Sequence, residues 1–172
     1  MILPEVRDPR MITLRRGGSL TDEHHQLLAR WAADCAEHVL PLFTAARPAD
    51  ERPAEAITAG RAWADGELPM MTARALGGHA MGAARDLRGA ARFAAYSAGQ
   101  AACVGHVAEH DLGAAAYAIK AAMAAVPTVE AETTRHTECA WQRDQLPAEV
   151  RGLVLEDQAA RNDICWWVFD AG

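Results

Sequence analysis

The chain has 172 residues, of which 51% are hydrophobic and 23% are charged, proportions typical of a single compact soluble domain. This composition excludes a disordered tail, because five Trp residues are costly to leave in water. Alanine contributes 39 residues and aromatic residues only 6%, which favours helix because Ala is the best helix former. We therefore predict an all-α fold with little or no sheet.

The charge is unevenly distributed along the chain. The formal net charge is −6, and residues 109–172 carry 11 acidic and only 5 basic side chains. An acidic surface repels phosphate backbones and attracts basic proteins, so we predict a basic protein partner and no nucleic acid. Sixteen of the 17 basic residues are Arg, and we assign no Arg-dependent function to this bias.

Cysteine spacing and the N-terminal residues bear on the compartment. The four Cys are widely separated with no CxxC pair, which predicts reduced, buried thiols. Residues 1–18 place charged side chains where a secretory signal needs an apolar core, so we predict a cytoplasmic protein. The longest uncharged stretch, residues 93–108, is too short and too polar for a membrane span, and we predict no membrane association.

The predicted elements begin with an extended N-terminal arm over residues 1–20 that ends in a turn. Residues 21–172 are expected to form a single domain of six or seven helices in an orthogonal or bundle-like array. Thr21 is a natural N-cap for the first helix, which Pro41 is expected to kink or end. Pro53 suits the first position of a second helix.

A third helix is predicted from Pro69 to about Ala84. Gly78 and Gly82 lie four residues apart on one face of it, a spacing that allows close packing against another helix.

The Ala-rich region from residue 87 to 126 must contain two helices, because roughly 40 helical residues would span about 60 Å. We predict the break between them near residues 109–113. Two more helices follow from Thr128 and from about Ala148, and the run Cys165–Phe169 is expected to dock into the core. The inward side chains of the helix from Thr128 are expected to be Val129, Thr133, His136 and Cys139 or Ala140.

One group of residues has spacing compatible with a transition-metal site, because Cys103, His106 and His110 could share a helix face. Zinc needs four convergent ligands, however, and no dense cluster is present, so buried, hydrogen-bonded histidine is the favoured interpretation. Burial inside an Ala-rich helix would also raise the pKa of the Cys103 thiol. A metal-dependent or thiol enzyme using these three residues remains the alternative hypothesis, and we predict no cofactor.

Candidate partner-binding residues fall into an aromatic group and an acidic group. Trp166 and Trp167 are of the type that dominates interfaces, although core packing is favoured for them. The acidic candidates are expected to be solvated surface charges, with Asp157 able to pair with Arg161 one turn later. The full candidate set is Arg61, Trp63, Asp65, Glu130, Glu132, Glu156 and Asp157.

Four blocks in order along residues 10–126 carry a family resemblance: RMITLRRGGSLT, LLARWAADCAEHVLPLF, RPAEAITAGRAWADGE and GQAACVGHVAEHDLGAAAYAIKAA. Together they resemble the Imm-5-like family of bacterial immunity proteins found in polymorphic toxin systems. The resemblance implies a small helical cytoplasmic protein that binds and blocks a cognate toxin, with no catalytic residues to carry over. The resulting hypothesis is a non-catalytic inhibitor whose acidic helical surface meets a basic toxin, and homodimer formation remains open.

Overall fold

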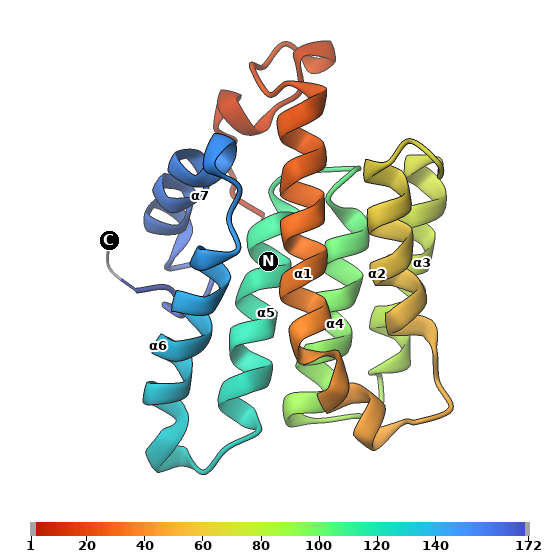
Figure 1. Ribbon diagram of the computed structural model, residues 1–172, viewed down its shortest axis with the longest axis vertical. Helices are drawn as coiled ribbons and strands as arrows, with labels where there is room; N and C mark the ends of the chain where they lie inside the picture. Colours follow the sequence, from red (N-terminus) through yellow and green to blue (C-terminus); the bar gives the residue numbers. More distant parts are fainter. Residues whose placement is uncertain (1–2, 171–172) are drawn as a thin grey trace.

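The computed structural model describes residues 3–170 and confirms the all-α prediction, because this range contains seven α-helices and no strand (Figure 1). The helices are α1 (Asp22–Ala46), α2 (Arg52–Ala64), α3 (Met70–Ala83), α4 (Gly89–Cys103), α5 (His110–Ala124), α6 (Thr128–Asp144) and α7 (Ala148–Arg161). Helices α4 and α5 pack on each other and α1 packs on both, while α2 and α3 cover one side and α6 the other. None of the described helices combines the length and apolarity needed to cross a membrane.

Helix α1 starts as the sequence predicts but continues beyond its proline. The Thr21 hydroxyl accepts a hydrogen bond from the His24 amide at 3.1 Å and caps the helix. Pro41 does not end α1, which continues to Ala46. The missing amide removes one backbone hydrogen bond, and burial of Val39 and Phe43 on either side of the proline offsets that loss.

Two glycines let α3 and α4 approach closely, but they are not the pair that the spacing predicted. A Cβ on Gly77 would lie 2.6 Å from the carbonyl oxygen of Gly99, and a Cβ on Gly99 would lie 2.7 Å from that of Gly77. Both distances are too short for any side chain. Gly78 and Gly82 face open space, so the prediction that they mediate helix packing is wrong.

The break between α4 and α5 comes earlier than predicted, at residues 104–109 rather than 109–113. Its first carbonyl, that of Val104, is hydrogen-bonded to Nε2 of His25 in α1 at 2.7 Å. At Gly105 the backbone passes so close to the Trp63 ring that a Cβ there would lie 2.5 Å from it. Contacts with other helices therefore determine where the chain turns.

The N-terminal arm is less extended than predicted. It forms two short 3₁₀ turns, η1 (Pro9–Met11) and η2 (Leu14–Arg16), and folds over one end of the helices (Figure 1). Met11 and Leu20 are buried against the helices. Two nitrogens of Arg7 each donate a hydrogen bond of 2.6 Å to the buried carboxylate of Glu109, which ties the arm to the α4–α5 connection.

The inward face of α6 is polar, contrary to the prediction. Val129 is 89% exposed, and Thr133 and His136 are also exposed. The buried side chains of α6 are Arg135, Glu138, Cys139 and Gln142, of which only Cys139 was predicted. Hydrogen bonds make this burial possible, since the Gln142 amide donates to the Ala115 carbonyl at 3.2 Å and to the Glu138 carboxylate at 3.0 Å.

Candidate partner-binding face

The structure does not bring Cys103, His106 and His110 together as a ligand set. Helix α4 ends at Cys103, His106 lies in the following loop and α5 starts at His110, so the three do not share a helix. Across residues 3–170, no group of three or more His, Cys, Asp and Glu side chains is arranged to hold a metal ion. His110 instead makes a 2.7 Å hydrogen bond from Nδ1 to the Gln100 side chain, and burial lowers its pKa to about 4.

The four cysteines are free and buried, which confirms that prediction. Burial raises the pKa of every thiol, that of Cys165 to about 12. A thiol kept in its protonated form is a poor nucleophile.

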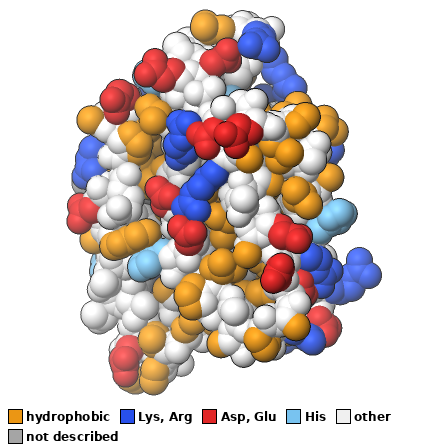
Figure 2. Space-filling view, turned by 45° about the vertical axis from the view of Figure 1, so that its right-hand side comes forward, with side chains coloured by type: hydrophobic (Ala, Val, Ile, Leu, Met, Phe, Trp, Pro, Cys, Tyr) orange, Lys and Arg blue, Asp and Glu red, His pale blue; other side chains and the backbone are white. Residues whose placement is uncertain are grey.

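The candidates at the end of α2 hold that helix against α1. Arg61 forms ion pairs with Asp34 at 2.7 Å and Glu37 at 2.8 Å, and Asp65 pairs with Arg30 at 2.5 Å. On the face that Figure 2 shows, acidic and basic side chains lie beside one another among apolar ones. These charges are matched within the chain and leave no single-sign patch at this site.

The two acidic candidates on α7 have different environments. Glu156 is exposed and pairs with Arg10 of the arm at 2.5 Å. Asp157 is buried, so the prediction of a solvated surface charge is wrong for this residue. Its predicted pairing with Arg161 is present, with Nε donating to Oδ1 at 2.7 Å, and Arg161 also donates to the Glu109 carbonyl. This network joins α7 to the α4–α5 connection inside the protein.

The acidic candidates on α6 are the sequence neighbours of a residue that lines an apolar groove. Glu130 and Glu132 are exposed and flank Ala131, which lines a groove of about 510 Å³ between α5, α6 and the C-terminal segment. Glu132 also pairs with Arg135 at 2.7 Å, whereas Glu130 makes no ion pair in the part of the chain that the structure describes. The remaining groove residues are Phe93, Lys120, Met123, Ala124, Val126, Thr128, Trp166 and Val168.

The C-terminal segment docks only in part, contrary to the prediction. Phe169 is buried, but Trp166 and Trp167 are 41% and 69% exposed. Both Trp residues have left-handed backbone, with φ of 59° and 58°. A non-glycine residue in a sparsely populated backbone region costs about 1–3 kcal/mol and persists only when its surroundings impose it.

Side chains from neighbouring segments impose this conformation. The Asn162 side chain donates to the Phe169 carbonyl at 3.0 Å and accepts from the Phe169 amide at 3.1 Å. Arg135 of α6 donates to the Val168 carbonyl at 2.9 Å. The strained segment is therefore anchored at its carboxyl end while the two Trp rings face outward.

Trp166 is fixed by an aromatic cluster on α4 and α5. Its ring lies 5.0 Å from the Tyr117 ring, and Tyr117 stacks on Tyr96 at 5.2 Å. The Lys120 ammonium lies 4.0 Å from the Trp166 ring centre, a cation–π contact. We give the name tryptophan face to Glu130, Glu132, Trp166 and Trp167 together with the groove that Ala131 and Trp166 line.

Comparison with protein families identifies the chain. A family model described as Imm-5 like putative immunity protein matches residues 18–149. The chain belongs to the Imm-5-like family. The family resemblance is thereby confirmed, and the family's description implies a toxin as the general kind of partner. Neither the curated proteins nor the solved structures gave a match.

The match includes Glu130 and Glu132 and ends at residue 149, at the start of α7 and before the two exposed Trp residues. The tryptophan face of this Imm-5-like protein thus combines acidic residues within the match with aromatic residues outside it.

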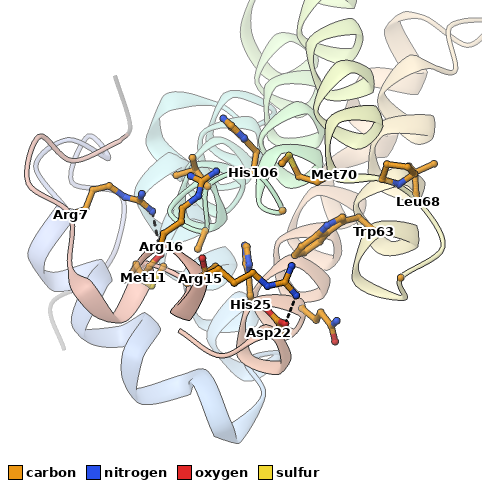
Figure 3. Close-up of a pocket in the computed structure, with 17 residues that line it drawn as sticks. Arg7, Met11, Arg15, Arg16, Asp22, His25, Trp63, Leu68, Met70 and His106 are labelled. Carbon is orange, nitrogen blue, oxygen red and sulfur yellow. Dashed lines mark hydrogen bonds and ion pairs between the residues drawn. The ribbon is translucent and has the colours of Figure 1, made fainter. Parts of the chain in front are cut away.

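Sequence reasoning missed a second feature of this Imm-5-like protein, a cavity of about 470 Å³ between the arm and the helices (Figure 3). Arg7, Arg15 and Arg16 line it, together with His25 and Trp63. The one sequence signal for this cavity was the Arg-Arg-Gly-Gly turn of the arm. The residues that face this turn come from three other segments, and the spacing of residues along the chain does not predict them.

Proposed function

We propose that this immunity protein neutralises its toxin by binding it at the tryptophan face, with Trp167 as the anchor. The observation that carries the proposal is an indole 69% exposed on strained but anchored backbone. Tryptophan is enriched among the few residues that contribute most of the binding energy of an interface. Backbone strain at exposed side chains is typical of functional segments, and here it supports a role in presenting the two rings.

The charge of this region favours a basic toxin. Glu130, Glu132 and Asp163 are exposed there, whereas other acidic side chains of the last third, such as Asp157, are buried. Complementary charge accelerates the encounter of two proteins and disfavours partners of the same sign. The partner surface that suits this face is therefore one with Arg or Lys residues around an apolar centre.

The rigidity of the face also supports binding. Trp166 is already packed against Tyr117 and Lys120, so little side-chain freedom would be lost on association. The groove beside it offers apolar surface for a side chain of the toxin. No reaction is required for this function, because occupying the toxin's surface is sufficient to block it.

The test is the affinity for the toxin encoded by the neighbouring gene, measured by calorimetry with an inactivated toxin. Trp167→Ala should weaken binding by at least 30-fold, the equivalent of about 2 kcal/mol for an interface hot spot. Met71→Ala removes another exposed apolar side chain, on α3, and should leave the affinity unchanged. Glu130→Lys should slow association most strongly at low salt.

The same variants can be scored by protection of cells that produce the toxin. A toxin that binds Trp167→Ala and Glu130→Lys as tightly as the unsubstituted chain would show that it docks elsewhere.

A further inference from the structure

The cavity at the arm end of the helices has the size and composition of a small-molecule site. Its volume of about 470 Å³ lies within the range of about 300–1,000 Å³ found for ligand pockets. Four segments form its walls: the arm, the start of α1, the α2–α3 connection and the α4–α5 connection (Figure 3).

Positive charge predominates along the lining. It contains three Arg against one carboxylate, that of Asp22. Arg7 is neutralised by Glu109 and Arg15 pairs with Asp22 at 3.1 Å. Arg16 makes no ion pair within residues 3–170. Its guanidinium is therefore available to an anion, and its planar group of donors suits a carboxylate or a phosphate.

His106 lines the same wall. Its Nδ1 is buried without a hydrogen-bond partner, which costs free energy until a partner is supplied. Burial and the positive charges of Arg74, Arg16 and Arg7 lower the pKa of His106. Arg7 and Arg16 line the cavity beside His106, and their positive charges would favour a negative ligand.

The start of α3 contributes further positive potential. Pro69 and Met70 line the cavity, and Met70 is the first residue of the helix. The first turn of α3 has neither a side-chain cap nor an acidic residue. The positive end of the helix dipole is thus uncompensated where it meets the cavity.

The opposite part of the cavity is apolar and rigid. Trp63 packs edge-on against His25 with ring centres 4.8 Å apart, and the Gly105 backbone leaves no room behind the indole. Leu68 and Met70 lie beside it (Figure 3). This surface suits the hydrocarbon or aromatic body of a ligand whose charged group faces the arginines.

We propose that this cavity binds a small organic anion, with a phosphate or carboxylate group at Arg16 and an apolar or aromatic body against Trp63. The site is formed by residues other than those of the tryptophan face, so it does not depend on the proposed toxin binding.

The proposal is tested by calorimetry on the full chain in a buffer free of phosphate and carboxylate. The probes are phenyl phosphate, benzoate, inorganic phosphate and the neutral benzyl alcohol. At least one ring-bearing anion should bind tenfold more tightly than inorganic phosphate, and benzyl alcohol should not bind. Preference between phenyl phosphate and benzoate identifies the charged group.

Two variants locate the binding. Arg16→Ala should weaken binding of the preferred anion at least fivefold. The variant should still fold, because Arg16 is exposed and contributes little to stability. Arg88→Ala is the matched control, because Arg88 is an exposed arginine beside the start of α4, away from the cavity lining. Unfolding curves of both variants check that each is folded. The proposal is overturned if neither anion binds at millimolar concentration, if benzyl alcohol binds equally, or if Arg88→Ala loses as much affinity as Arg16→Ala.

Discussion

The contact between α3 and α4 predicts opposite effects of one substitution at two adjacent glycines. In Gly77→Ala the new methyl group would lie 2.6 Å from the Gly99 carbonyl oxygen and 3.0 Å from the Cys103 sulfur. The oxygen belongs to the backbone of a buried helix, so relief requires the two helices to separate. In Gly78→Ala the same methyl group meets nothing within 4 Å.

The magnitudes follow from helix propensity and overpacking. Replacing Gly with Ala in a helix interior is favourable by about 0.5–1 kcal/mol when the methyl group is accommodated. Extra atoms forced into a packed core cost about 1–3 kcal/mol, and a backbone contact of this kind belongs at the upper end. We therefore expect Gly78→Ala to raise the free energy of unfolding by about 0.5–1 kcal/mol, and Gly77→Ala to lower it by about 2–2.5 kcal/mol.

Urea unfolding followed by circular dichroism measures both changes, and the two variants serve as each other's control for composition and position in α3. Gly99→Ala should behave like Gly77→Ala, because its methyl group would lie 2.7 Å from the Gly77 carbonyl oxygen. Equal stability of Gly77→Ala and Gly78→Ala would refute the close approach of α3 and α4 as the structure shows it.

Three further predictions concern other parts of the protein. Phe169→Ala should lower the free energy of unfolding, measured in urea, by about 3–5 kcal/mol because the ring is buried. Trp167→Ala should change it by less than about 0.5 kcal/mol. Comparable losses in the two variants would contradict the outward placement of Trp167. Burial lowers the pKa of His110 from 6.5 to about 4, so the unfolded chain binds a proton on this residue more readily than the folded chain. Protonation of His110 therefore favours unfolding, and stability is lost as the pH falls from 6.5 towards 4. The loss is up to about 1.4 kcal/mol per pH unit. In His110→Gln the free energy of unfolding from urea curves should differ less between pH 7 and pH 5 than in the unsubstituted chain. The same difference in both proteins would contradict the lowered pKa of His110. Iodoacetamide should modify Cys103 at least 100-fold faster in urea than in native buffer, because burial keeps the thiol protonated. Mass spectrometry of the peptide that contains Cys103 measures the labelling. Rapid labelling of the native protein would instead indicate a reactive thiol.

Much of the fold follows from local signals in the sequence. Thr21 and Pro53 mark the starts of α1 and α2, and Gly66, with φ of 76°, follows the end of α2. These residues act through their own backbone, so their effect can be predicted without knowing the rest of the structure. The persistence of α1 beyond Pro41 depends on packing against other helices and could not be predicted in this way.

The inward face of α6 shows the same limit for side chains. Apolar periodicity favoured Val129, but the position is 89% exposed, and Gln142 is buried instead. Gln142 is tolerated there because a carbonyl of α5 and a carboxylate of α6 accept its amide protons. A pattern of hydrophobic residues contains no information on such partners.

The candidate site was predicted in fragments. Glu130, Glu132 and the Trp166–Trp167 pair were each singled out, but the groove that Ala131 and Trp166 line depends on how the C-terminal segment folds back beside α5 and α6. Asp157 could not be recognised as buried, because its partner Arg161 also donates to the carbonyl of Glu109, 52 residues earlier in the chain. The arginine-lined cavity likewise brings together four segments that are distant in sequence.

Amide hydrogen exchange of the chain with and without its toxin tests the central proposal most directly. Binding at the tryptophan face predicts slower exchange at residues 128–132 and 163–168, and little change in α2 and α3. Protection confined to α2 and α3, with residues 163–168 exchanging as in the free protein, would contradict toxin binding at the tryptophan face.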